Sequence, residues 1–288
     1  SHGIAHDFEG KFVELLLSSL PFQLTSAQIR VINEIKSDLQ SQMPMHRLLQ
    51  GDVGSGKTLV ALAGLLSAVE GGRQGVIMAP TEVLAEQHYL GISDLIESFK
   101  VPCPENLMGE RPLRIELLTS RTSQRDRSRI CIGLSEGSVD IVIGTHSLIQ
   151  EGIEFRDLGL TVIDEQHRFG VDQRAALRAK ASGEEIPDLL VMTATPIPRT
   201  AAMTVYGDLD VSVLDELPPG RTPISTKWVE DDSEVWEKVR NQISQGNQAY
   251  VVCPLIGDND TSQKASVEKT HKRLVEAELG GLNVDLLH

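Results

Sequence analysis

Residues 51–58, GDVGSGKT, place glycines, a lysine and a threonine at the spacing of a phosphate-binding loop. Glycines let consecutive backbone N–H groups point at a phosphate without Cβ clashes, and a helix that begins near Lys57 adds the positive end of its dipole. We expect Lys57 to bind the β- and γ-phosphates of a nucleotide and Thr58 to bind Mg²⁺. A glycine-rich turn without a ligand is the alternative, and the strand-like and helix-like runs on either side weigh against it. The predicted nucleotide-binding residues of the loop are Gly51, Asp52, Val53, Gly54, Ser55, Gly56, Lys57 and Thr58.

Two adjacent carboxylates follow an apolar run in LTVIDEQH, residues 160–167. We expect Asp164 to hold Mg²⁺ through its water shell and Glu165 to orient or deprotonate an attacking water. An acidic helix cap after a buried strand would have the same composition. Together with the phosphate-binding loop, however, the pair indicates hydrolysis of a nucleoside triphosphate, with ATP and Mg²⁺ as cofactors and with Lys57, Asp164 and Glu165 as the catalytic residues.

Parallel strands that end at one edge of a sheet would bring these groups together. Short apolar runs alternate with helical patterns through the first two thirds of the chain, which predicts an α/β fold with a parallel sheet covered on both faces. The predicted strands are RLLQ (47–50), GVIMA (75–79), RIELLT (114–119), VDIVIG (139–144), LTVID (160–164) and DLLVMTA (188–194). Helices are expected before them, over residues 7–20 and, with Thr25 as N-cap, over residues 25–40.

The prolines of LDELPPGRTP, residues 214–223, forbid a helix and predict a linker. A second βαβ series follows, with strands expected at residues 224–230, 248–256 and 282–287 and helices at residues 233–244 and 266–279. We therefore expect a linker helix in residues 1–20, a complete nucleotide-binding domain in residues 21–213 and an incomplete second domain in residues 224–288.

The composition limits the class of protein. No run approaches the roughly 18 apolar residues of a membrane span, and Cys103, Cys131 and Cys253 form no CxxC pair, so we expect a reduced cytoplasmic protein without structural zinc. The net charge of −14 argues against a broad surface that wraps a polyanion, although a narrow track of backbone amides remains compatible with it. The arginine-rich residues 111–129 form either a patch that contacts nucleic acid or, as we favour, a solvated face.

The order of the motifs along the chain resembles that of a known protein family. Five stretches of the chain follow one another in the order of motifs I, Ia, Ib, II and III of superfamily 2 helicases: GDVGSGKT, APTEVLAEQH, GTHSLI, DEQHRFG and TATPIPRT. Together with LPFQLTSAQ before them and DLDVSVLDELPPGRTP after them, they resemble most closely the RecG family of bacterial branched-DNA helicases. The resemblance covers residues 20–288. It implies two RecA-like domains and an ATP-driven motor that remodels forks and junctions of DNA in recombination and repair.

The resemblance also implies roles for single residues. Phe22 and Gln28 match positions that stack on and bond to adenine, and the alternative is a hydrophobic staple and a surface glutamine. The roles of Arg168 and Arg199 stay open, and the alternative is that each only pairs with a carboxylate. The residues expected to couple hydrolysis to domain movement are Gln166, His167, Thr193 and Thr195, although His167 could equally be a packed histidine. The residues expected to meet the DNA backbone, mostly through N–H groups, are Pro80, Thr81, Glu82, Gly144 and Thr145, with His146 as a weaker candidate.

Several alternatives stay open on the sequence. A transcription-repair coupling translocase, a primosomal helicase or an RNA helicase would share most of the motifs, and a non-catalytic module would share the loop. RecG-like proteins also have an N-terminal wedge domain and, in the second domain, motifs V and VI with the arginines that complete the ATP site. None of these lies within the chain, so we expect a fragment that hydrolyses ATP slowly by itself. We further expect a monomer without membrane association, and the sequence carries no signal for a protein partner such as a single-strand DNA-binding protein.

Overall fold

The structure of the chain, a computed structural model, describes residues 3–103, 107–149, 152–164, 185–195, 209–216, 225–253 and 268–286. The chain divides into two compact units, Ser1–Arg221 and Thr222–His288. Each unit has an apolar core of its own.

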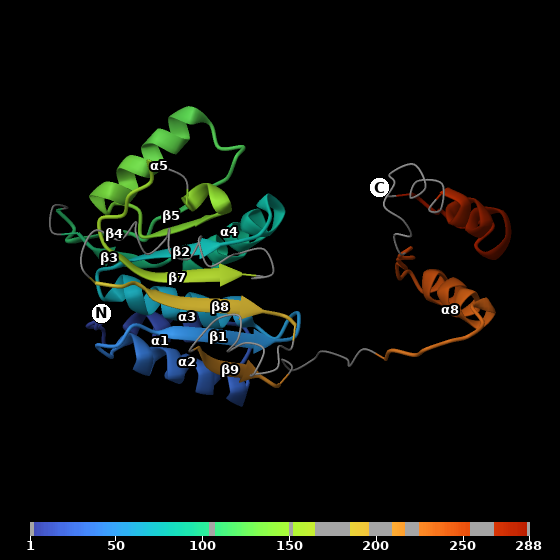
Figure 1. Ribbon diagram of the computed structural model, residues 1–288, viewed down its shortest axis with the longest axis horizontal. Helices are drawn as coiled ribbons and strands as arrows, with labels where there is room; N and C mark the ends of the chain where they lie inside the picture. The colour runs from blue at the N-terminus through green and yellow to red at the C-terminus, as the bar shows by residue number, and fades with distance from the viewer. Residues whose placement is uncertain are drawn as a thin grey trace. The chain divides into compact units, whose positions relative to one another are not determined.

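A seven-stranded parallel sheet forms the centre of the first unit, in the order β5-β6-β2-β7-β8-β1-β9. In Figure 1 the arrowheads of these strands point to the same side, so their carboxyl ends share one edge. All six strands predicted from the sequence are confirmed. The strands are β1 (His46–Gly51), β2 (Gln74–Met78), β5 (Ile115–Leu118), β6 (Ile141–Gly144), β7 (Leu158–Asp164), β8 (Asp188–Thr193) and β9 (Asp210–Leu214).

Strand β9 was not predicted as a strand. It pairs with β1 at the edge of the sheet and ends at Leu214, the residue that the sequence assigned to the start of the linker. Leu214 is buried in the core instead. A short antiparallel pair, β3 (Lys100–Pro102) and β4 (Glu110–Pro112), is a second addition to the predicted elements.

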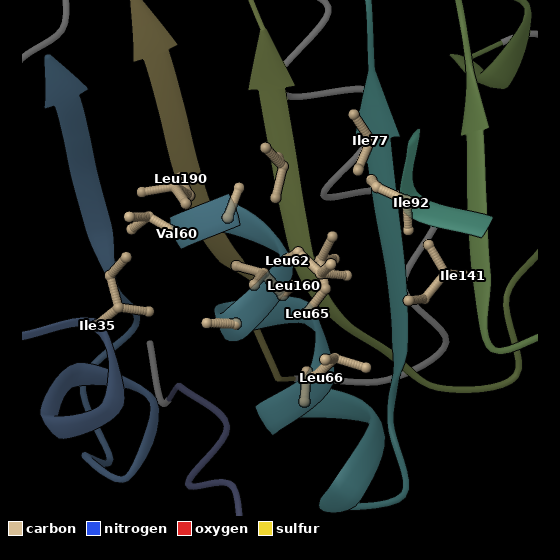
Figure 2. Packing of buried hydrophobic residues seen from close by; sticks show 14 of the residues in the cluster. Ile35, Val60, Leu62, Leu65, Leu66, Ile77, Ile92, Ile141, Leu160 and Leu190 are labelled. Carbon is tan, nitrogen blue, oxygen red and sulfur yellow. The ribbon is translucent and has the colours of Figure 1, made fainter. Parts of the chain in front are cut away.

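Helices cover both faces of the sheet. The apolar cluster on one face includes Ile77, Leu160 and Leu190 from the strands and side chains of α1, α2, α3 and α4, whereas alternate strand residues such as Val76 pack with α5 on the other face. Figure 2 shows side chains of α3 and of the strands meeting in the first of these clusters. The helices are α1 (Lys11–Ser19), α2 (Ser26–Leu39), α3 (Lys57–Glu70), α4 (Glu82–Ile96), α5 (Gln124–Glu136) and the short 3₁₀ helix η1 (His146–Ile149).

Helix α3, which follows the glycine-rich loop, is buried on all sides, since every residue from Val60 to Val69 is buried. Its last residue, Glu70, also sets the start of α1. The Glu70 carboxylate accepts hydrogen bonds from the backbone N–H groups of residues 9–12, and Gly10 is left-handed with φ 96°. The helix expected over residues 7–20 is therefore shorter and begins at Lys11.

The second unit differs from its prediction. Helix α8 (Ser233–Ser244) is confirmed, and residues 268–273 are α-helical and continue into the π-helical turn η3 (Leu274–Glu278). The strands expected at residues 224–230, 248–256 and 282–287 are wrong for the described part of the unit, residues 225–253 and 268–286, which contains no strand. An apolar run becomes a strand only when a neighbour completes its hydrogen bonds, and here Trp228, Tyr250 and Val252 remain exposed.

Candidate functional site

The phosphate-binding loop joins β1 to α3 at the carboxyl edge of the sheet. Two of its glycines, Gly54 and Gly56, have positive φ angles of 79° and 90°. At Gly56 there is a second reason for glycine besides the positive φ, because a Cβ atom would overlap Nε2 of Gln28. The loop therefore has the left-handed turns and close backbone approach that a cradle of N–H groups needs.

The Lys57 ammonium lies within the loop. Its Nζ donates to the carbonyl oxygens of Gly51 at 2.6 Å and Asp52 at 3.0 Å. Thr58 follows in the first turn of α3, where its side chain is half-buried. The Ser55 hydroxyl is buried and has no hydrogen-bond partner among the described residues, which is the kind of polar group that a bound ligand or water satisfies.

Gln28 joins α2 to the loop. Its Oε1 accepts from the backbone N–H of Thr25 at 2.9 Å, completing a capping box with the Thr25 hydroxyl, and its Nε2 donates to the Ser55 carbonyl at 2.8 Å. The predicted N-cap is confirmed, while the alternative of a surface glutamine is wrong because Gln28 is only 3% exposed. Phe22, by contrast, is 52% exposed, as a residue that stacks on a base would be.

Asp164 ends β7, and its partner comes from a different part of the chain. Nε2 of His88, on α4, lies 2.6 Å from Oδ2 of Asp164, and the two side chains are 11% and 10% exposed. His88 was not among the residues predicted for the site. In the sequence, His88 is marked only as the last residue of APTEVLAEQH. Its partner lies 76 residues farther along the chain, and only the fold brings the two close together.

Thr193 and Thr195 lie at the end of β8, the strand next to β7, where Met192 is in register with Asp164. The Thr193 hydroxyl lies 3.0 Å from the hydroxyl of Thr195 and accepts a hydrogen bond from the Thr195 N–H. The two threonines thus bond to each other, and their role in coupling hydrolysis to domain movement stays a prediction. Residues 165–168 and 196–200 are outside the described part of the chain, and with them lie the predicted Glu165, Gln166, His167, Arg168 and Arg199.

The donor atoms at this edge suit Mg²⁺. The Asp164 carboxylate and the Thr58 hydroxyl supply oxygen atoms, which this hard cation prefers. No group of three or more metal-binding side chains occurs among the described residues. Mg²⁺ typically keeps its waters and takes one or two carboxylates together with the phosphates of a nucleotide, so a sparse oxygen set of this kind fits it.

The start of α4 exposes backbone, as the sequence predicted for a contact with a nucleic-acid strand. Thr81 is exposed and caps the helix, its hydroxyl accepting from the N–H of Leu84 at 3.3 Å; Pro80 before it is half-buried. The Glu82 side chain points to the neighbouring loop, where it accepts from the Ser120 N–H at 3.0 Å and pairs with Arg121 at 3.0 Å. The Glu82 carboxylate is thus engaged by the neighbouring loop, and the part of Glu82 in binding DNA stays a prediction.

Gly144 and Thr145, the other predicted contacts, are buried at the end of β6. A Cβ atom on Gly144 would overlap the Leu118 carbonyl oxygen, and the Thr145 hydroxyl lies 3.2 Å from that of Ser147, which in turn donates to Leu118. Both residues therefore have structural roles, and their part in binding DNA stays a prediction.

Three of the six arginines in residues 111–129 form ion pairs with carboxylates among the described residues: Arg111, Arg121 and Arg129. Arg111 binds Asp140 through two hydrogen bonds of 2.6 and 2.8 Å, and Asp140 holds the pKa of this arginine above its usual value. Arg129 binds Glu116 at 2.5 Å. With side chains that are 71% and 57% exposed, Arg121 and Arg129 support the interpretation of the segment as a solvated face.

Comparison with known proteins shows the family to which the chain belongs. Residues 25–204 match the family model of the DEAD/DEAH box helicases. The chain is 47% identical over 282 residues to the ATP-dependent DNA helicase RecG of Synechocystis sp., covering 97% of this chain and 32% of that protein. It is 44% identical over 290 residues to the ATP-dependent DNA helicase RecG of Bacillus subtilis, covering 100% of this chain and 40% of that protein. The chain thus spans about a third to two fifths of the length of the curated relatives it matches.

Solved structures give the same result. The structure of RecG bound to a three-way DNA junction matches with a TM-score of 0.77 and 42% identity, over 96% of this chain and 34% of that chain. A DUF1998 helicase, MrfA, bound to DNA matches at 18% identity with a TM-score of 0.58, a likeness of fold alone. The RecA-like fold class and the resemblance drawn from the motifs are confirmed. Among the described residues no helix is both long and apolar enough to cross a membrane.

Proposed function

The chain belongs to the DEAD/DEAH box helicase family, and from this premise we propose that its loop binds ATP with Mg²⁺ and that ATP hydrolysis drives a RecG-type motor on branched DNA. The observation that carries the proposal is the identity of 42–47% with RecG helicases over almost the whole chain. The phosphate-binding loop and Asp164 at one edge of the sheet support it, because nucleotide sites of parallel α/β folds lie at this edge.

Each residue of the proposed site has a separate task. The N–H groups of the loop and the start of α3 bind the phosphates, Lys57 exchanges its bonds to Gly51 and Asp52 for bonds to phosphate oxygens, and Thr58 and Asp164 hold Mg²⁺. When bound, the metal neutralises charge on the phosphates. Glu165 accepts a proton from the attacking water. Phe22, exposed a few residues before α2, stacks on the adenine, while Gln28 holds the loop through the Ser55 carbonyl.

The proposed DNA contact is made with the sugar-phosphate backbone at the start of α4, with Pro80 and Thr81. A helix N-terminus binds phosphates without reading base sequence, which suits a motor that moves along any DNA. It also suits a chain with a net charge of −14, because backbone amides replace the many lysines and arginines of a basic surface. Forked or three-way duplex DNA is the proposed substrate, in keeping with the junction in the related RecG structure.

The nucleotide site is tested by titrating the chain with a fluorescent ADP analogue in the presence of Mg²⁺. We expect Lys57→Ala to raise the Kd about 10- to 100-fold, the loss of a charged hydrogen bond to phosphate. Lys238→Ala, which removes an exposed lysine of α8, is the matched control and should bind as the wild type does. Equal affinity of the Lys57 and Lys238 variants would exclude this loop as the nucleotide site.

The nucleic-acid partner is tested by fluorescence anisotropy with a labelled three-way DNA junction, a linear DNA duplex and an RNA duplex of equal length. The two DNA ligands should bind more tightly than RNA, and their affinity should fall as salt rises because phosphates are the main contact. Tighter binding of RNA would instead support an RNA helicase of the same family.

A further inference from the structure

One contact of the site has no place in the proposed chemistry. The imidazole of His88 approaches Oδ2 of Asp164 at 2.6 Å, a short distance for a hydrogen bond between nitrogen and oxygen. Both side chains are about nine-tenths buried, so water is largely excluded from the pair. A contact of this length between enclosed polar groups fixes the position of each.

We propose that His88 is a positioning residue for the metal site, which donates Nε2–H to Asp164 and so orients its carboxylate toward Mg²⁺. The inference rests on the proposed function, since it assigns to Asp164 the role of magnesium ligand. A carboxylate at the end of a strand can turn about its side-chain bonds. A donor fixed on one oxygen leaves the other oxygen in a defined direction, as the hydrogen-bonding partners of metal ligands generally do.

The position of His88 in α4 extends the inference. His88 lies seven residues, about 10 Å along the helix axis, from the N-cap Thr81, where the DNA backbone is proposed to bind. One rigid helix therefore carries the proposed DNA contact at its end and the donor to the metal-binding carboxylate two turns farther on.

The test compares three substitutions at one position. His88→Ala removes the donor, His88→Gln places an amide nitrogen close to the position of Nε2, and His88→Asn has an amide too short to reach it. The measured quantity is the Mg²⁺ concentration that gives half of the metal-dependent gain in affinity for the fluorescent ADP analogue, with a second titration in EDTA. Circular dichroism establishes that each variant is folded.

We expect His88→Ala and His88→Asn to raise the half-saturating Mg²⁺ concentration about 10- to 100-fold, the usual effect of losing such a partner. Affinity in EDTA should stay the same, because the hydrogen bond of His88 is to Asp164 and the phosphates are bound by residues 51–58, and His88→Gln should restore the wild-type curve. A role in packing alone predicts the opposite pattern, in which the variants lose affinity with and without metal and glutamine gives no rescue.

Lys57→Ala separates this proposal from the one on which it rests. If Lys57→Ala binds nucleotide as the wild type does, the nucleotide site itself is wrong. If Lys57→Ala binds weakly and His88→Ala has the magnesium dependence of the wild type, only the role of His88 is overturned. Should His88→Ala fail to fold, the comparison of His88→Gln with His88→Asn decides, and equal magnesium curves for the two would overturn the proposal.

Discussion

At the scale of single residues, Gln28 shows how one side chain can belong to two structures. Its carbonyl oxygen completes the cap of α2, and its amide group holds the Ser55 carbonyl in the phosphate loop. The same amide fills the space where a Cβ of residue 56 would lie. The loop and the helix are thereby joined through one buried side chain.

Replacing Gln28 by alanine should weaken both structures. The buried Thr25 N–H and Ser55 carbonyl would lose their partners, at a cost of about 1–3 kcal/mol for each such group. We expect a lower free energy of unfolding in urea and weaker binding of the ADP analogue. The control is Gln87→Ala, which removes a glutamine that is exposed on α4. A Gln28 variant as stable as this control would show that the two bonds contribute nothing net.

Glu165→Gln tests the proposed general base. The amide cannot accept a proton from water, so hydrolysis should fall about 10²- to 10⁴-fold while nucleotide affinity stays within a factor of two or so. Single-turnover hydrolysis of ATP by the chain, beside a titration with the ADP analogue, measures both quantities. Comparable hydrolysis by variant and wild type would mean that the base is another residue.

At the scale of elements, two helices offer a matched pair of caps. Thr81 caps α4 by accepting from Leu84 N–H, and Ser123 caps α5 by accepting from Asp126 N–H at 3.1 Å. Alanine at either position should lower the free energy of unfolding by about 1 kcal/mol. Only Thr81→Ala should also weaken binding to the three-way DNA junction, since α5 has no part in the proposed contact. Equal DNA affinities of the two variants would remove α4 from the DNA surface.

The elements also show where sequence reasoning succeeds. Strands β1, β2, β5, β6, β7 and β8 could be predicted because parallel strands buried on both faces are continuous apolar runs. Strand β9, DVSVL, alternates polar and apolar residues at a sheet edge, and its pattern gave no such signal. In the described residues of the second unit, the apolar runs have no neighbouring strand with which to pair. The rule that apolar runs form strands therefore predicted strands that do not form there.

The candidate site also has parts that could be predicted from the sequence and parts that could not. The conformation of the loop at residues 51–58 could be predicted because all its residues are consecutive, while its binding of phosphate stays a prediction. The contact of His88 with Asp164 could not, because it depends on the order of strands in the sheet and on which turn of α4 reaches the end of β7. The bond between Thr193 and Thr195 was likewise invisible, since two neighbouring hydroxyls can bond to each other or to a carboxylate.

At the scale of the whole molecule, the two units can be observed separately. Both tryptophans of the chain, Trp228 and Trp236, belong to the second unit, whereas all strands of the described residues belong to the first. Tryptophan fluorescence therefore reports on the second unit, and circular dichroism is dominated by the first. The proposed nucleotide site lies wholly within the first unit.

Bound nucleotide should consequently stabilise one unit and not the other. Mg²⁺-ADP at 100 times its Kd adds about 2.7 kcal/mol to the stability of the state that binds it. We expect the urea midpoint followed by circular dichroism to rise with nucleotide, while the midpoint followed by tryptophan fluorescence stays constant. Midpoints that coincide and rise together would show that the two units unfold as one.

Strand β9 has a mechanical consequence. It lies parallel to β1 through five paired residues, from Arg47 and Asp210 to Gly51 and Leu214, and Arg30 adds a hydrogen bond to the Val213 carbonyl. From β9 the chain continues toward the second unit. The hydrogen bonds of a parallel ladder run across the strands, so tension along β9 shears them all at once, whereas the end-on opening of a hairpin breaks them one at a time. The edge strand thus anchors the connection against a pull, and it passes the load to β1, the strand that ends in the phosphate loop.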